Sequence, residues 1–272
     1  MLMTVAHSIA LVYFFVLGMC FGSFALATVW RIHKKKDFLK DRSRCEHCKH
    51  VLAPKDLIPL FSWVYLHGKC SYCKKPLSRL MPLAELFAGV VFASSYAMWP
   101  ESFGSVLGVI RFAVWCAALV LLLILFFYDL QWYLLPNKVI YPLWAIAGLD
   151  FILRFIQTPN FRTLAYGAIS VLVSAGLFFV FYFVSKGTWI GFGDVRLGLA
   201  IGLLLGQPWL AGMALFLSSI IGVIAVIPGV IKHKTTLKSK IPYGPLLIIA
   251  LIVVRLVGAR FVDWYSVHIL LL

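Results

Sequence analysis

Two acidic residues stand at the edges of long apolar runs, where a carboxylate is costly unless it has a partner or a function. Asp194 ends the segment Gly191-Phe192-Gly193-Asp194 directly before an apolar stretch, and Asp129 ends another such stretch. Two carboxylates that approach each other share a proton. The ionised one can then take a proton from water, while the protonated one polarises a peptide carbonyl. The pair therefore predicts the chemistry of an aspartic protease.

Simpler roles are open for the membrane acids. Asp194 would serve as the N-cap of the helix that follows it. A proton-coupled transporter would also use two such acids, but the sequence shows no clear internal repeat. No G-x-S-x-G, H-E-x-x-H or P-loop motif supports another hydrolytic or nucleotide-binding mechanism. A third acid, Glu85, is expected to form a structural ion pair with Arg79.

Four cysteines form two CxxC pairs, Cys45 with Cys48 and Cys70 with Cys73. Two such knuckles can supply the four thiolates of a tetrahedral zinc site, and zinc would stabilise a segment too short to have a large core. We expect a structural zinc ion, with a redox dithiol pair or a catalytic zinc as the alternatives. Four thiolates complete the coordination, so the nearby histidines are expected on the surface. These histidines are His47, His50 and His67.

The composition indicates an all-α polytopic membrane protein. Hydrophobic residues make up 62% of the chain and charged residues 13%, against about 45–50% and about 25% in soluble domains. Apolar runs of membrane-crossing length recur, while the short alternating segments of a β-barrel are absent. We expect about eight transmembrane helices, near residues 8–30, 81–99, 106–128, 139–156, 163–184, 194–205, 210–231 and 241–257, and an interfacial tail at 258–272. The segment 194–205 is short for a full crossing.

The predicted domains follow from these spans. They are a first transmembrane helix (1–30), a tetracysteine zinc-binding insert (31–80), and a transmembrane core of about seven helices (81–272). Below, residues 31–80 are called the insert.

Basic residues predict how the chain is oriented in the membrane. With eight spans, five of the 25 Lys and Arg lie on the face opposite the insert, and the remaining 20 lie on the insert's face. The five are Arg111, Arg154, Arg162, Arg255 and Arg260. Because positive residues stay inside, the insert is expected to be cytoplasmic, with both termini outside. We therefore interpret the formal net charge of +15 as a topology signal. The positive charge also favours binding to anionic lipid and is not taken to indicate a nucleic-acid partner. A cytoplasmic insert also suits reduced thiols.

Six motifs follow one another in the order of a known family. They are Phe21-Gly22-Ser23-Phe24 with Arg31; the two cysteine pairs; Arg79 with Pro82 and Glu85-Leu86; Asp129 with Leu135-Pro136; Gly191-x-Gly193-Asp194; and Ile241-Pro242-Tyr243-Gly244-Pro245. In these motifs the chain resembles, over almost its whole length, the prepilin peptidases, or type IV leader peptidases, which are membrane aspartic proteases with a GxGD motif.

The resemblance implies that Asp129 and Asp194 are the catalytic pair and that Cys45, Cys48, Cys70 and Cys73 bind zinc. Enzymes of this family cut the basic leader from type IV prepilins and pseudopilins after a glycine, at the cytoplasmic face of the bacterial inner membrane. Many then methylate the new N-terminus with S-adenosylmethionine. The alternatives from other classes are a proton-coupled transporter and a noncatalytic zinc-containing scaffold of a secretion or pilus system.

Four positions depart from the family pattern. Leu26 stands in place of an Asn and His33 in place of a Pro, in the part of the chain that the resemblance associates with methylation. Asn137 replaces an acid, and Arg196 replaces a Lys. No glycine-rich loop for S-adenosylmethionine is readable, so the residues that would bind it stay unassigned.

Overall fold

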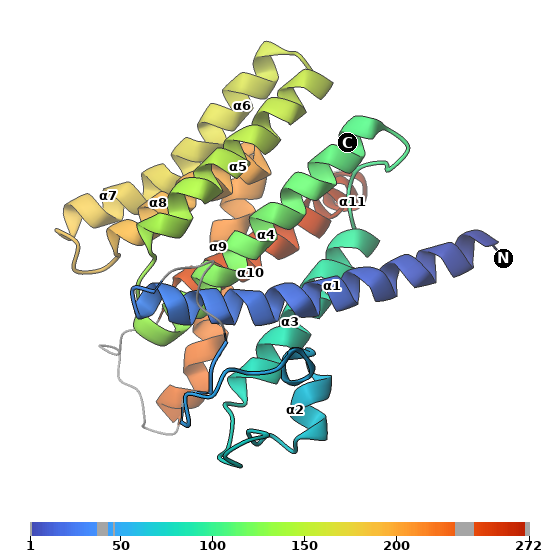
Figure 1. The fold of residues 1–272 in the computed structure, drawn as a ribbon. Coiled ribbons are helices and arrows are strands. Elements are labelled where there is room, and N and C mark those ends of the chain that lie inside the picture. Colours follow the sequence, from blue (N-terminus) through green and yellow to red (C-terminus); the bar gives the residue numbers. More distant parts are fainter. Residues whose placement is uncertain (1, 37–42, 46, 232–241, 270–272) are drawn as a thin grey trace. The chain divides into compact units, whose positions relative to one another are not determined.

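The computed structural model describes residues 2–36, 43–45, 47–231 and 242–269, and the side chains of all of these except 2–4 and 228–230. In these residues the regular structure is helical, apart from two isolated bridges, which confirms the predicted all-α fold (Figure 1). The chain divides into two compact units, Met1–Met98 and Trp99–Leu272. The domain boundaries drawn from the sequence at residues 30 and 80 stay a prediction.

Unit 1 consists of two long helices and the insert between them. Its helices are α1 (Leu2–His33), η1 (Pro54–Leu57), α2 (Phe61–Tyr65) and α3 (Leu80–Ala97). Glycines on α1 let α3 approach closely, because a Cβ on Gly22 would lie 2.8 Å from the carbonyl oxygen of Ala84. Small residues at such contacts are the usual means by which membrane helices pack.

Glu85 does not have the partner that the sequence suggested. Its side chain is buried on α3, and its Oε2 accepts a hydrogen bond of 2.7 Å from the backbone N–H of Leu60 and another from Ser23. Within the described residues no ion pair joins Glu85 to Arg79, so that prediction was wrong. The insert folds back far enough for its backbone to reach the carboxylate, and a buried carboxylate satisfied in this way needs no cation.

Unit 2 is a bundle of helices. They are α4 (Val106–Trp132), α5 (Asn137–Gln157), α6 (Phe161–Val171), the π-helical turn η2 (Leu172–Gly176), α7 (Leu177–Val184), α8 (Phe192–Leu205), α9 (Pro208–Ile231), α10 (Gly244–Val253), the π-helical turn η3 (Val254–Gly258) and α11 (Ala259–His268).

Seven helical segments of the described chain are long and apolar enough to cross a membrane. They are Val5–His33, Leu80–Ala97, Val106–Trp132, Asn137–Gln157, Phe161–Val184, Pro208–Ile227 and Gly244–His268. The eighth predicted span is α8, which has only 14 residues and is short, as its sequence predicted. The last helix is longer than predicted: it runs on through η3 to His268 instead of ending near Val257, because no proline interrupts it. The protein is a multi-pass membrane protein.

α8 lies in the centre of unit 2. Five of its apolar side chains are fully buried, namely Leu197, Ala200, Ile201, Leu204 and Leu205. A Cβ on Gly198 would lie 2.9 Å from the carbonyl oxygen of Ser174 in η2. The hydroxyl of Ser174 in turn donates a 2.8 Å hydrogen bond to the carbonyl oxygen of Gly198. Close backbone packing and serine hydrogen bonds therefore fix α8 against the α6–α7 segment.

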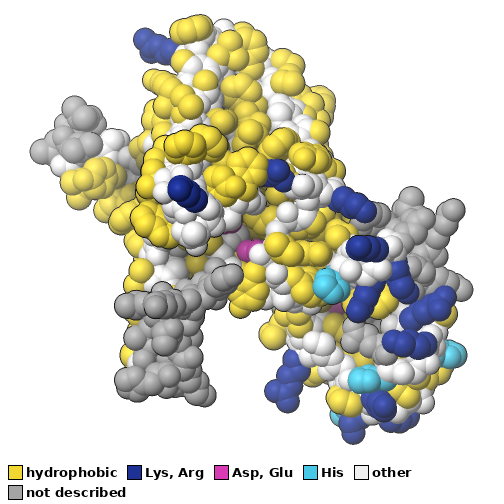
Figure 2. All heavy atoms as spheres, turned by 90° about the vertical axis from the view of Figure 1, so that its left-hand side faces the viewer, with side chains coloured by type: hydrophobic (Ala, Val, Ile, Leu, Met, Phe, Trp, Pro, Cys, Tyr) yellow, Lys and Arg dark blue, Asp and Glu magenta, His cyan; other side chains and the backbone are white. Residues whose placement is uncertain are grey.

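The surface of the insert and the surfaces of the transmembrane helices carry different kinds of side chain. Lys, Arg and His side chains gather over the insert, whereas the transmembrane helices are covered mostly by hydrophobic side chains (Figure 2). Many large apolar side chains on the transmembrane helices are exposed, among them Val106, Phe161, Phe183 and Phe216. Such helix surfaces are expected to face lipid.

Candidate functional site

Asp129 lies in the last turn of α4 and is almost completely buried. The helix ends at Tyr133, whose backbone is left-handed and whose N–H donates to the carbonyl oxygen of Asp129. The carboxylate accepts a hydrogen bond of 3.1 Å on Oδ2 from the backbone N–H of Gly244, the first residue of α10. Asp129 is therefore held at the N-terminal end of a helix, where backbone N–H groups and the helix dipole attract negative charge.

Asp194 lies in the first turn of α8 and is half-buried. The N-cap of α8 is Gly191, so the simple reading of Asp194 as the N-cap is wrong. The Asp194 carboxyl instead reaches back to accept a hydrogen bond from the backbone N–H of Gly191. This contact fixes the direction of the side chain at the start of the helix.

Leu135, in the turn after α4, connects the surroundings of the two acids. A Cβ on Gly193 would lie 3.2 Å from Leu135 Cβ, and a Cβ on Gly244 would lie 3.4 Å from Leu135 Cδ2. The carboxyl groups of Asp129 and Asp194 also interact electrostatically. The structure thus brings together two acids that are far apart in the sequence and that come from α4 and α8.

A second set of contacts beside the aspartates was not foreseen from the sequence. The guanidinium of Arg196 donates to Asn137 Oδ1 at the start of α5, and Trp144 Nε1 donates to the carbonyl oxygen of Arg196 at 2.9 Å. Asn137 and Arg196 had been noted only as two separate departures from the family pattern. Their contact joins α5 to the first turns of α8, and the simultaneous change at both positions was the signal that could have revealed it.

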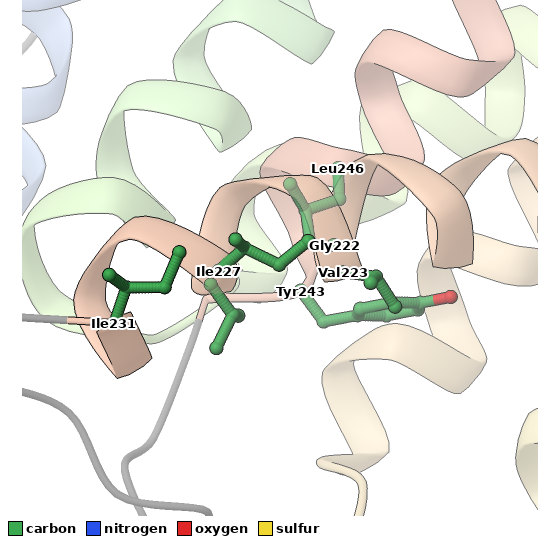
Figure 3. A pocket seen from close by; sticks show the side chains of 7 residues that line it. Gly222, Val223, Ile227, Ile231, Tyr243 and Leu246 are labelled. Carbon is green, nitrogen blue, oxygen red and sulfur yellow. The ribbon is translucent and has the colours of Figure 1, made fainter.

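An apolar cavity of about 450 Å³ lies between α9 and the start of α10 (Figure 3). Its walls are Gly222, Val223, Val226, Ile227, Ile231, Tyr243 and Leu246. Tyr243 directly precedes Gly244, the residue that binds Asp129, and its hydroxyl lies 2.8 Å from Ser218 Oγ. The cavity therefore offers room for an apolar group beside the segment that holds Asp129. Ile241, in the same motif, lies outside the described residues.

The four paired cysteines form one cluster in the insert. Their sulfur atoms all lie within 4.8 Å of one another, and the Sγ atoms of Cys45 and Cys73 are 3.8 Å apart. Tetrahedral zinc with Zn–S bonds of about 2.3 Å requires sulfur–sulfur distances of about 3.8 Å. The donor set and its spacing therefore fit zinc.

The two cysteine pairs have the same backbone structure. Cys45 N–H donates to the carbonyl oxygen of His50, and Cys70 N–H donates to that of Lys75. Lys49 and Lys74 both have left-handed backbones, with φ of 60° and 57°, and each donates its N–H to the carbonyl oxygen of the first cysteine of its pair. This repeat orients two thiolates of each pair toward one point, as a zinc knuckle does.

The thiols differ in their electrostatic surroundings. Burial raises the pKa of Cys45, but hydrogen bonds from the backbone N–H groups of Cys48 and His47 outweigh it and lower this pKa to about 7. A thiolate is the form that binds metal. Among the described residues the ligand cluster contains only the four cysteines, and His50 instead packs against the ring of Tyr72.

Comparison with known proteins assigns the chain to a family. Residues 16–99 match the bacterial peptidase A24 N-terminal domain, and residues 116–227 match the type IV leader peptidase family. The chain is 30% identical over 233 residues to a prepilin leader peptidase/N-methyltransferase of Aeromonas hydrophila, covering 84% of this chain and 76% of that protein. Enzymes with the same name from Legionella pneumophila and Bacillus subtilis are 32% and 27% identical and cover 85% and 92% of this chain, and 77% and 96% of their own. No solved structure matches the chain. The motifs read from the sequence and these matches agree, and the chain belongs to the type IV leader peptidase family.

Proposed function

We propose that this protein is a prepilin leader peptidase, which removes the basic leader of type IV prepilins or pseudopilins after a glycine. The observation that carries the proposal is the convergence of Asp129 and Asp194 beside Leu135 and Gly244, in a chain of this family. The names of its relatives supply the substrate class.

In the proposed mechanism the two aspartates share one proton. The ionised carboxylate takes a proton from a water molecule, whose oxygen attacks the carbonyl carbon of the scissile bond. The protonated carboxyl donates to the carbonyl oxygen, and a proton then passes to the leaving amine as the carbon–nitrogen bond breaks. The N–H of Gly244 donates to Asp129 Oδ2, and this contact supports the proposal because it orients one of the two carboxyl groups.

The substrate of such an enzyme includes an apolar membrane segment. The apolar cavity beside Tyr243 is suited to a hydrophobic side chain of that segment, because its lining is almost entirely apolar and Gly244 lies next to it. We propose that this cavity receives part of the segment that follows the cleaved bond.

The proposed reaction takes place at the cytoplasmic face of the inner membrane. The insert and the first turn of α8 lie on the same side of the predicted topology, and this side carries most of the Lys and Arg. Exposed cations on the insert would also hold it near anionic lipid headgroups.

Zinc is proposed to have a structural role. Cys45, Cys48, Cys70 and Cys73 would hold it, and the ion would cross-link the two cysteine pairs of the insert.

Loss of zinc should loosen the insert more than it impairs proteolysis. We expect Cys70→Ser to lower the zinc content and to speed hydrogen exchange and trypsin cleavage in residues 43–79, because the thiolate cross-link is lost. Leader cleavage should fall by less than about tenfold, since the change removes none of the groups of the proposed acid–base pair. Cys20→Ser is the matched control, because Cys20 is an exposed cysteine outside the cluster. If cleavage stopped in a Cys70→Ser protein that is folded and inserted, zinc would have a role beyond structure.

Methylation by S-adenosylmethionine is proposed only from the names of the relatives. The cavity near α10 is apolar, and a second cavity, lined by Ser23, Asp56, Trp63, Ser71 and Glu85 among others in unit 1, has a volume of about 40 Å³. Pockets for ligands of this kind are about 300–1,000 Å³ and carry several polar groups. Neither cavity fits the cofactor as the structure stands, so no step is assigned to it.

The proposed activity can be tested with the purified protein in liposomes. A prepilin with an intact basic leader should be shortened at one glycine, as shown by mass spectrometry of the product. A transporter would leave the prepilin intact and move a solute in a manner that depends on Asp129. A scaffold would bind pilus or secretion components without cleaving, and would depend on the cysteines but not on the aspartates.

A further inference from the structure

Buried charged residues gather in unit 2 at the helix ends remote from the aspartates. Arg111 on α4 and Arg255 in η3 are 3% and 6% exposed, and Asp150 on α5 is fully buried. Asp150 accepts three ion pairs, from Arg111 at 3.4 Å, Arg255 at 3.3 Å and Arg154 at 3.6 Å. Glu101 pairs with Arg111 at 2.5 Å. We call these five residues the arginine cluster.

Two members of the arginine cluster bind the end of α8. Arg154 donates to the carbonyl oxygens of Leu204 and Leu205, at 2.9 and 2.5 Å. Arg255 donates to the carbonyl oxygen of Leu204 at 2.5 Å. The last carbonyls of any helix lack partners within the helix, so these guanidinium groups satisfy them.

The end of α8 also offsets part of the positive charge of the arginine cluster. The arginine cluster contains three guanidinium groups and two carboxylates, which leaves one positive charge in excess. The C-terminus of a helix carries about half a negative charge, so α8 offsets part of this excess. Arg255 also lies over the rings of Trp99 and Trp115, at 5.3 and 5.7 Å from their centres. Moving the end of α8 would take the carbonyl acceptors away from the guanidinium groups of Arg154 and Arg255, which is costly inside a membrane protein.

The helices joined by the arginine cluster are the helices that form the aspartate site at their other ends (Figure 1). At the arginine cluster lie Arg111 of α4, Asp150 and Arg154 of α5, Leu204 of α8 and Arg255 of the α10–η3 helix. At the aspartate site lie Asp129 of α4, Asn137 of α5, Asp194 of α8 and Gly244 of the α10–η3 helix. A helix rises about 1.5 Å per residue, so Asp194 and Leu204 are about 15 Å apart along α8.

We propose that the arginine cluster positions the two aspartates. In this proposal, which rests on the proposed function, Arg154 and Arg255 are positioning residues that act through α8 and α10 without contacting the substrate. They fix the position of α8 along its own axis, and a helix transmits an axial shift from Leu204 to Asp194 with little loss. A misplacement of about 1 Å at the reacting groups can lower a rate about 100-fold.

Substitution of Arg154 and Arg255 tests the proposal, because a positioning role should change kcat and leave KM nearly unchanged. We expect Arg154→Met and Arg255→Met each to lower kcat by about 10- to 100-fold, with KM changed by less than about twofold. Arg154→Lys and Arg255→Lys should recover part of the loss, because lysine keeps the charge but not the fork that reaches two acceptors. The matched controls are Arg162→Met and Arg260→Met, which replace exposed arginines of the same unit and should leave kcat unchanged.

A distance measurement tests the same proposal without enzyme activity. Asp129→Cys and Asp194→Cys are combined in one chain, and the rate of cross-linking between positions 129 and 194 by a short bifunctional thiol reagent is followed by mass spectrometry. Adding Arg255→Lys should slow this cross-link about tenfold, whereas adding Arg260→Lys should not. Circular dichroism measures the helical content of every variant. If the methionine variants fail to fold, the lysine variants test the proposal.

The outcomes separate this proposal from the proposed function. If Asp129→Asn and Asp194→Asn kept full activity, the proposed mechanism would fail, but the cross-linking result would still report whether the arginines position the two helices. If the methionine and lysine variants of Arg154 and Arg255 folded with unchanged kcat, and Arg255→Lys left the cross-linking rate unchanged, the arginine cluster would be a structural feature only and the proposal would be overturned.

Discussion

Asp129→Asn and Asp194→Asn should each lower kcat for prepilin cleavage by about 1,000-fold or more, the upper part of the range for loss of acid–base catalysis. The amide cannot exchange a proton with water or with the peptide, yet it has nearly the same shape as the carboxyl group. In Asp129→Asn the side-chain oxygen can still accept the hydrogen bond from Gly244, so the fold should be kept. Single-turnover cleavage in liposomes measures the effect.

The double variant adds a second measure of whether the two aspartates act together. The effects of groups that act as one unit are not additive. The double variant Asp129→Asn with Asp194→Asn should therefore cleave no more slowly than the less active of the two single variants. Asp263→Asn is the control, because Asp263 is an exposed acid on α11. A single variant that cleaved at the wild-type rate would refute the pair mechanism, whereas an independent loss at each position would assign the two acids to separate steps.

The features that could be predicted from the sequence are those encoded locally. Membrane helices are visible as long apolar runs, and the zinc cluster follows from two CxxC pairs, because each knuckle is built from a few consecutive residues. The approach of Asp129 to Asp194 was predictable in outline, since each lies at the end of an apolar run and both ends are on the same side of the predicted topology. Their shared neighbour, Leu135, appears only in the folded chain.

Features that depend on distant backbone contacts could not be predicted. Glu85 is satisfied by the N–H of Leu60, and a backbone group carries no signal in the sequence. The arginines at positions 111, 154 and 255 were counted only as markers of the outer side. Their ion pairs with Asp150 show that charge type alone does not distinguish a topology signal from an internal ionic cluster. The continuation of the last helix through η3 was missed because a glycine near its middle resembled an end.

A methyl group added at Gly244 should impair catalysis strongly, although less than loss of an aspartate. The Cβ of Gly244→Ala would lie 2.7 Å from Asp129 Oδ2 and 3.3 Å from its Cγ, so the carboxylate must move and its hydrogen bond from the Gly244 N–H must lengthen. We expect kcat to fall about 100-fold, as for a misplaced catalytic group, while thermal stability changes little, because a single side chain is displaced.

Two other glycines turn this prediction into a graded series. A Cβ on Gly193 would approach the Cβ and Cδ1 of Leu135 most closely, at 3.2 and 3.3 Å, with no atom of Asp129 among its nearest neighbours, so Gly193→Ala should have an intermediate effect. A Cβ on Gly212 would meet nothing within 4 Å, and Gly212→Ala should cleave at the wild-type rate. The order of kcat is thus Gly212→Ala, then Gly193→Ala, then Gly244→Ala. Equal rates for Gly244→Ala and Gly212→Ala would mean that the Gly244 contact does not control Asp129. If only Gly193→Ala lowered kcat, the position of Asp194 and not that of Asp129 would be the one that an added methyl group disturbs.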